Sequence, residues 1–304
     1  MKKEINYIQE INHLKQEKNA IILAHFYQPL EIQDIADFVG DSYDLSVKAK
    51  NTQESTIVFC GVSFMTETAK ILSPKKTVLN PNPYAKCPMA AMIDAEEVKR
   101  LKIQYPGADV LCYINTTAEV KAVSDVCVTS SSALRIVNKL LSDKIIFVPD
   151  KHLADYVQLS TDKKIIPGRG YCYVHIRFQE ENLRKAKTLH PDAKVIVHPE
   201  CSKEVIKLSD MALGTSGMIK YVEKSDFSKF IIGTEKGLID RMARMFPDKT
   251  FYSAGPPSVC FNMKKIRLKD VHQALLYNQH EVNLPADILQ NANKCLEKMI
   301  EYSK

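Results

Sequence analysis

The chain has 304 residues, a net charge of +6, 45% hydrophobic residues and 26% charged residues. These proportions are typical of a folded globular protein and exclude an intrinsically disordered chain. Its lysines and arginines are spread rather than clustered, which argues against a nucleic-acid surface and weakly favours a small acidic substrate. The longest apolar runs fall short of the roughly 18 residues that a membrane span needs, so we expect a cytoplasmic protein with no membrane partner.

Strands and helices alternate along the chain in an order that repeats three times, with a period of about 87 residues. Each stretch has an apolar first strand, a short helix, a second strand that runs into a hydroxyl residue, a helix, a third strand, a helix and a short fourth strand. The first strands are expected at 20–25, 110–115 and 194–199, the third at 56–61, 144–150 and 230–235, and the fourth at 76–79, 163–166 and 249–252. This alternation predicts units with parallel α/β layers.

The connections between the stretches repeat as well. Polar helices at 96–110 and 180–195 each contain a proline just before the next first strand, and residues 6–20 take this place in the first stretch. We therefore predict an α/β fold of three homologous three-layer αβα domains with parallel sheets, arranged around a pseudo-threefold axis. The expected boundaries are 1–87, 88–172 and 173–260, followed by a helical tail, 261–304, that packs on the first domain.

A shared aspartate, at Asp37, Asp125 and Asp210, sets the three stretches in register. Before it, at the end of each first strand, stands a polar pair: His25 and Tyr27, Tyr113 and Asn115, or His198 and Glu200. After it, at equal distance, come Ser42, Ser130 and Thr215. Because ligands bind beyond the carboxyl ends of parallel strands, we expect these side chains to meet in one central cavity. The hydroxyls are expected at helix N-caps, where free amides favour an anion, although such a residue is often only a cap.

Each stretch ends on a cysteine, at Cys87, Cys172 or Cys260. Cytosolic thiols stay reduced, so the eight cysteines of the chain are not expected to form a disulfide framework. Three thiolates that converge on the axis suit a [4Fe–4S] cluster whose fourth iron is open to substrate. Zinc bound by the same thiolates and His175 is the alternative. The cysteines that lack the register are left out of the site; they are Cys60, Cys112, Cys127, Cys201 and Cys295.

A set of motifs spans nearly the whole chain: LAHFYQ, DIADFVGDS, GVSFMTETAKIL, CPMA, VTSSSA, GYCYVH, VIVHPEC, GTSGM, IGTEKGL and VCFNMKK. They occur together and in the order of the quinolinate synthase family, which the chain resembles. The resemblance implies three α/β domains around an oxygen-sensitive [4Fe–4S] cluster. It also implies the condensation of iminosuccinate with dihydroxyacetone phosphate to quinolinate, phosphate and two waters in de novo NAD biosynthesis. An L-aspartate oxidase that supplies iminosuccinate is the functional partner it suggests.

Carried over by position, the resemblance assigns the cluster ligands to Cys87, Cys172 and Cys260. It assigns substrate binding to His25, Ser42, Tyr113, Asn115, Ser130, His198, Glu200 and Thr215. The catalytic set is Glu200, Tyr113, His198, Tyr27 and His175, with Glu200 as general base and acid. The open iron is expected to act as a Lewis acid that helps hydroxide to leave.

Two other classes of protein remain compatible with the same residues. A hydroxy-acid dehydratase would also use an open iron but would need one substrate and no triose phosphate. An iron–sulfur or zinc protein of electron transfer or sensing would hold its metal through four protein ligands, and the polar strand ends would then have no role.

Overall fold

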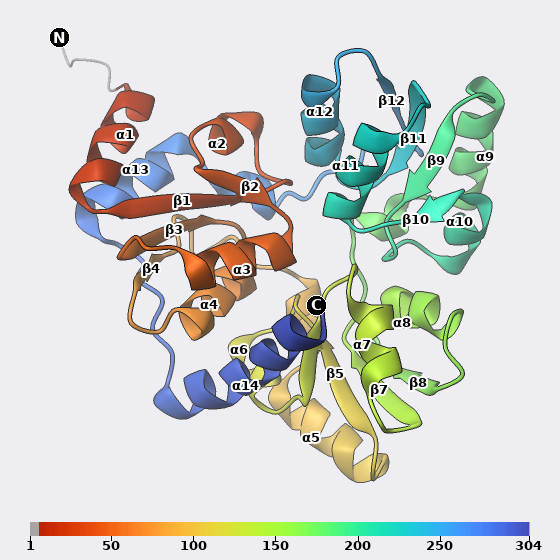
Figure 1. Cartoon of the computed structure of the whole chain (residues 1–304), viewed down its shortest axis with the longest axis horizontal. Coiled ribbons are helices and arrows are strands. Elements are labelled where there is room, and N and C mark those ends of the chain that lie inside the picture. Colours follow the sequence, from red (N-terminus) through yellow and green to blue (C-terminus); the bar gives the residue numbers. More distant parts are fainter. Residues whose placement is uncertain (1–5, 304) are drawn as a thin grey trace.

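The structure is a computed structural model that describes residues 6–303. It contains three separate sheets of four parallel strands each, and none of the described strands closes into a barrel. Figure 1 shows these sheets and their helices grouped around the middle of the molecule. The strand orders are β2-β1-β3-β4, β6-β5-β7-β8 and β10-β9-β11-β12, so the first strand of each unit lies between the second and the third. The predicted fold class is confirmed.

The first unit is built on strands that are almost wholly buried, because helices cover the sheet. Every residue of β1 (Ala20–His25) and β3 (Thr56–Cys60) is buried. The edge strands are β2 (Phe38–Gly40) and β4 (Thr77–Leu79). Its helices are α1 (Tyr7–Glu17), α2 (Leu30–Asp34), α3 (Ser42–Asn51), α4 (Ser63–Leu72) and the 3₁₀ helix η1 (Met89–Met92).

The second and third units repeat this order of elements. The second has β5 (Asp109–Tyr113), β6 (Val126–Val128), β7 (Lys144–Val148), β8 (Lys164–Pro167), α5 (Ala95–Gln104), α6 (Ala118–Ala122), α7 (Ala133–Lys139), α8 (Lys151–Gln158) and η2 (His175–Arg177). The third has β9 (Lys194–Val197), β10 (Met211–Ala212), β11 (Lys229–Gly233), β12 (Thr250–Ser253), α9 (Glu180–Leu189), α10 (Lys203–Leu208), α11 (Thr215–Lys224), α12 (Lys236–Met245) and η3 (Met263–Lys265).

The shared aspartate has the same structural task in all three units. One carboxylate oxygen accepts a hydrogen bond from a backbone amide of the first strand, at Ile22 (2.8 Å), Val110 (2.8 Å) and Val195 (2.7 Å). The other oxygen pairs with Lys15, Lys102 or Lys194. The aspartate therefore fixes the loop before the second strand against the first strand, which sets both strand ends at one edge of the sheet.

The tail consists of α13 (Leu268–Tyr277) and α14 (Ala286–Tyr302), which lie on different units. Helix α13 packs on α1 of the first unit, with the His272 ring edge-on to Tyr7. Helix α14 packs mainly on α6 and β6 of the second unit and less on α4 of the first. Figure 1 shows α14 running beside α6. The expectation that the tail packs on the first unit thus describes α13, whereas α14 bridges two units.

We propose the domain boundaries as they were predicted, since each of 1–87, 88–172 and 173–260 encloses one sheet; each 3₁₀ helix lies just beyond the boundary of the unit with which it is grouped above. Between residues 6 and 303 there is no helix with the length and apolar character that a membrane crossing requires.

Candidate active site

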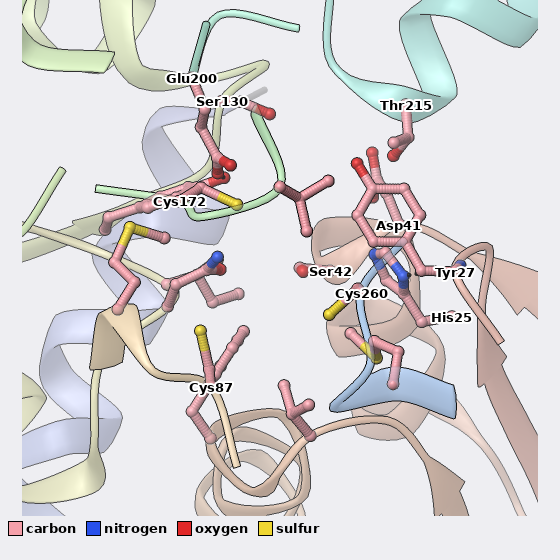
Figure 2. Close-up of a pocket in the computed structure, with 18 of the residues that line it drawn as sticks. His25, Tyr27, Asp41, Ser42, Cys87, Ser130, Cys172, Glu200, Thr215 and Cys260 are labelled. Carbon is pink, nitrogen blue, oxygen red and sulfur yellow. Dashed lines mark hydrogen bonds between the residues drawn. The ribbon is translucent and has the colours of Figure 1, made fainter. Parts of the chain in front are cut away.

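One cavity, with an empty volume of about 760 Å³ including its mouth, lies where the three units meet. Nearly all the residues predicted from the sequence line it, and they come from every unit: His25, Tyr27, Ser42, Cys87, Tyr113, Asn115, Ser130, Cys172, His198, Glu200, Thr215 and Cys260. His175 is the exception, because it lies behind Glu200 and contacts the cavity residues through hydrogen bonds. Figure 2 shows side chains from all three units pointing into this common space.

Two histidines at equivalent strand ends are held in the same orientation. The Nδ1 atom of His25 accepts a hydrogen bond from the Tyr27 amide (3.1 Å), and that of His198 accepts one from the Glu200 amide (3.2 Å). Burial lowers the pKa of each ring to about 3, aided by Lys264 near His25 and by His175 near His198. Both rings are therefore neutral, and Nε2–H is the donor that each retains for a ligand.

A chain of hydrogen bonds runs across the cavity wall and joins all three units. The Tyr113 hydroxyl donates to Glu200 Oε1 (2.5 Å), and Glu200 Oε2 lies 2.6 Å from His175 Nδ1. On its other side, His175 Nε2 lies 3.0 Å from Thr234 Oγ1, which is 2.8 Å from the Tyr27 hydroxyl. All five side chains are buried. The distances fit a tautomer in which His175 donates from Nδ1 to Glu200 and accepts at Nε2 from Thr234, which in turn accepts from Tyr27.

The carboxylate of Glu200 is ionised within this chain. Burial alone would raise its pKa, but the hydrogen bonds that it accepts from His175 and Tyr113 stabilise the charged form, and the pKa is lowered overall. Burial and the nearby Glu200 charge raise the pKa of both Tyr113 and Tyr27 well above its ordinary value. The two phenols therefore keep their protons and act as donors.

The hydroxyl residues are not helix caps, which corrects the prediction. Ser42 and Thr215 are the first residues of α3 and α11, and the caps are Asp41 and Gly214. Ser130 precedes Ser132, the cap of α7. In each case the predicted position was one or two residues from the cap, so the hydroxyl stays available to the cavity.

The helix N-termini differ in how open they are to an anion. The Asp41 carboxylate accepts from the Tyr43 and Asp44 amides (2.9 Å each), so it occupies the start of α3. The α11 terminus has no side-chain cap, because its cap residue is Gly214. A Cβ on Gly214 would lie 2.8 Å from Ser130 Oγ, so glycine is needed for the second and third units to approach this closely. The open terminus of α11 is the better anion site.

The three register cysteines occupy equivalent places, each just before a 3₁₀ helix. Burial raises the pKa of Cys87 to about 12 and that of Cys172 and Cys260 above the ordinary value. Backbone amides of the following turn, such as those of Ala90 and His175, act in the opposite direction by donating to the sulfur. In Figure 2 the three sulfurs turn toward the same space. Among the described residues that line the cavity there is no fourth cysteine.

A known protein family matches nearly the whole chain. The family model described as "Quinolinate synthetase A protein" matches residues 9–301. The chain belongs to the quinolinate synthetase A family.

Similar relatives cover the chain and are covered by it almost completely. A quinolinate synthase of Methanoregula boonei is 49% identical over 96% of this chain and 97% of its own length. One of Thermococcus kodakarensis is 48% identical over 100% of both chains, and one of Clostridium kluyveri is 50% identical over 96% and 97%. A solved structure, that of the E-1-hydroxy-2-methyl-but-2-enyl-4-diphosphate reductase from Plasmodium falciparum, aligns with a TM-score of 0.36 and 14% identity over 90% of this chain and 94% of its own.

As a member of the quinolinate synthetase A family, the protein is an enzyme of NAD biosynthesis that acts on small molecules and carries an iron–sulfur group. The donor set fits such a group, since three soft cysteine sulfurs face one cavity and are supported by amide donors. Cys172, His175 and Glu200 also lie with their ligand atoms within 4.8 Å of one another. However, both His175 nitrogens and both Glu200 oxygens already have partners in the hydrogen-bonded chain, which disfavours zinc at His175.

Several functional candidates of this quinolinate synthetase A protein were missed from the sequence. Thr234 and Glu235 follow β11, a third strand, whereas the recurring polar pairs and hydroxyls stand at the ends of first and second strands. Glu235 is fully buried, accepts a hydrogen bond from the Cys260 amide (3.1 Å) and forms an ion pair with Lys264 (3.2 Å). It therefore holds the loop that carries Cys260 in place. The five other cysteines are buried away from the cavity, and Cys112 and Cys295 pack with sulfurs 3.6 Å apart.

Proposed function

We propose that the enzyme condenses iminosuccinate with dihydroxyacetone phosphate to form quinolinate, with release of phosphate and two waters. The single observation that carries this proposal is the convergence of three thiols, an ionised carboxylate and several anion-binding groups on one cavity in a chain of this family. Both substrates are anionic, and the cavity lining offers several hydrogen-bond donors for anionic oxygens.

Substrate binding is proposed for the groups that offer donors to carboxylate or phosphate oxygens. His25 and His198 are neutral, so they contribute Nε2–H donors rather than charge. Thr215 and the free amides at the start of α11 form the anion site with Ser130, which lies directly against Gly214. The remaining binding residues are Ser42, Tyr113, Asn115 and Glu200.

Proton transfer is proposed to run through Glu200 and the chain behind it. The condensation and the dehydrations require a group that takes up and returns protons, and the ionised Glu200 faces the cavity for this purpose. Tyr27 is the other end of the chain. When the Tyr27 hydroxyl accepts a proton from substrate, it can pass its own proton to Thr234. Thr234 can in turn pass its proton to His175 Nε2, and Glu200 stabilises the resulting imidazolium. Tyr113 and His198 orient Glu200 from its two sides.

The iron–sulfur group is proposed to be a [4Fe–4S] cluster bound by Cys87, Cys172 and Cys260, which leaves one iron without a cysteine. When bound, such a cluster supplies a Lewis acid that helps a hydroxyl group of the substrate to leave. Burial disfavours a free thiolate at each of these three cysteines, whereas backbone amides of η1, η2 and η3 donate to the sulfur atoms and would stabilise them as ligands.

We also propose a cytoplasmic enzyme that takes iminosuccinate from an L-aspartate oxidase. An imine of this kind hydrolyses in water, so a supplying enzyme has to deliver it close to the point of use. Pull-down of an L-aspartate oxidase, or faster quinolinate formation in a coupled reaction than from free iminosuccinate, supports this link.

The proposed function is tested with anaerobically purified protein whose iron–sulfur group has been reconstituted and quantified. Given iminosuccinate and dihydroxyacetone phosphate, it should form quinolinate and phosphate in equal amounts. Turnover of a single hydroxy acid without the triose phosphate would instead identify a dehydratase. Protein that has a full complement of iron and sulfide but forms no quinolinate would reject the proposal.

A further inference from the structure

Behind the strand-end loop of the first unit, a buried side chain holds two backbone carbonyls. Gln33, in α2, is buried, and its Nε2 atom donates to the carbonyl oxygens of Phe26 (3.0 Å) and Gln28 (2.9 Å). These two carbonyls flank Tyr27, which lines the cavity. Gln33 therefore fixes the backbone on both sides of a candidate catalytic residue.

In the second unit a lysine takes the place of this glutamine in the repeat. Lys121, in α6, donates from Nζ to the carbonyl oxygens of Ile114 (2.9 Å) and Thr116 and more weakly to Thr116 Oγ1 (3.4 Å). The two carbonyls flank Asn115, another cavity residue. The corresponding position of the third unit is Ile206, which has no polar group to donate.

Lys121 differs from Gln33 because it carries a charge into the interior. Its exposed fraction is 0%, and the three donors of an ammonium are matched by the three loop oxygens. Among residues 6–303 no carboxylate forms an ion pair with it at 4.0 Å or less. Burial raises the pKa of Glu67 and the nearby Lys121 charge acts against this, but the Glu67 carboxylate accepts its hydrogen bond from the Ala118 amide (2.8 Å). The ammonium also lies 5.5 Å from the ring centroid of Phe64, a residue of the cavity wall.

The loop that Lys121 holds has a backbone amide without an acceptor. In the first and third units the equivalent amides, of Tyr27 and Glu200, donate to a histidine Nδ1. Tyr113 replaces that histidine in the second unit, and within the described part of the chain the Asn115 amide has no hydrogen-bond partner. The peptide between Ile114 and Asn115 presents its carbonyl to Lys121, so the Asn115 N–H points away from the ammonium.

We infer that Lys121 is a positioning residue that fixes the Asn115 loop and polarises the free Asn115 amide to bind an anionic oxygen of the substrate. The inference rests on the proposed function, because it assigns a carboxylate or phosphate group of that substrate to this amide. Gln33 has the same mechanical role for Tyr27 without a charge. A buried cation without a partner acid is costly on its own, so an anion in the adjacent cavity stabilises it and is stabilised by it.

Three variants separate the mechanical role from the electrostatic one. Lys121→Gln copies Gln33, so the loop stays in place but the charge is lost; kcat should stay within about threefold and KM for the anionic substrates should rise on the order of tenfold. Lys121→Met removes both functions, so kcat should also fall by at least about tenfold. Ile206→Met, at the same position of the third unit, is the matched control and should change neither constant.

A binding measurement keeps the inference testable apart from turnover. Titration of inorganic phosphate into the cluster-loaded protein, followed by calorimetry, should give a Kd about tenfold weaker for Lys121→Gln than for the unmodified chain and Ile206→Met. An equal Kd for all three proteins would overturn the inference, as would an unchanged KM in Lys121→Gln. If the unmodified enzyme forms no quinolinate, the proposed function fails, while the phosphate titration still decides the role of Lys121.

Discussion

Replacing Glu200 by glutamine tests the proton-transfer proposal at its centre. The carboxylate is 2% exposed and accepts short hydrogen bonds from Tyr113 (2.5 Å) and His175 (2.6 Å). Glutamine has nearly the same shape but one acceptor oxygen instead of two, no negative charge and no ability to take up a proton. General acid–base catalysis contributes roughly 10²- to 10⁴-fold to rates, so kcat of Glu200→Gln should fall by that range. The mismatched buried donor should also cost about 1–3 kcal/mol of stability.

The assay follows quinolinate by chromatography under anaerobic conditions, with iron and sulfide measured in the same samples. The cluster content of Glu200→Gln should equal that of the unmodified protein, because Glu200 is not a proposed ligand. Glu204→Gln is the matched control, since Glu204 is an exposed residue of α10 only four positions along the chain. A Glu200→Gln protein with intact cluster and a kcat within a few-fold of the unmodified value would refute the assignment of Glu200 as base and acid.

Three further predictions follow from the same geometry. Thr234→Val removes both hydrogen bonds that link Tyr27 to His175, so kcat should fall about 10- to 100-fold with cluster content unchanged. A normal kcat would exclude the hydrogen bonds from Tyr27 through Thr234 to His175 as a proton path. Burial, aided by Lys264, lowers the pKa of His25 from 6.5 to about 3, so below pH 6.5 the unfolded chain binds a proton that the folded chain does not. His25 therefore costs no stability well above pH 6.5 and lowers stability progressively as pH falls toward 3. From pH 7 to 5.5 this loss should be about 1.3 kcal/mol in urea unfolding, and His25→Gln should lack it; an identical pH dependence in the variant would contradict the shift. Gly214→Ala places a Cβ 2.8 Å from Ser130 Oγ and should cost about 1–3 kcal/mol, part of which the double variant with Ser130→Ala should restore; equal destabilisation in both variants would mean that the contact with Ser130 is not the cause.

Much of the site could be predicted because the repeat places equivalent residues at equivalent strand ends. His25 and His198 recur at the ends of β1 and β9, and both face the cavity. The cysteines recur just before the 3₁₀ helices, although no motif of the chain predicted those helices. The shared aspartate was visible as a marker, but its bond to the first-strand amide follows from the packing of the loop against the strand.

Thr234, Lys121 and Gln33 were missed for two different reasons. Thr234 corresponds to Gly61 and Pro149 in the repeat, so no recurring polar group marked this position. Lys121 and Gln33 lie in short helices, where a polar residue is normally exposed, and only the fold turns them inward. The capping error at Ser42 has a simple cause: Asp41 is an equally strong cap, and helix boundaries are uncertain by a residue or two from sequence.

The most direct test of the account is Mössbauer spectroscopy of the protein loaded with ⁵⁷Fe, recorded with and without dihydroxyacetone phosphate and iminosuccinate. Three cysteine ligands for a [4Fe–4S] cluster predict that one iron site changes its spectrum when substrate binds while the other three keep theirs. A spectrum that is the same with and without bound substrate, or one that shows four equivalent thiolate-bound irons, would contradict the proposed open iron and with it the assignment of Cys87, Cys172 and Cys260 as the complete ligand set.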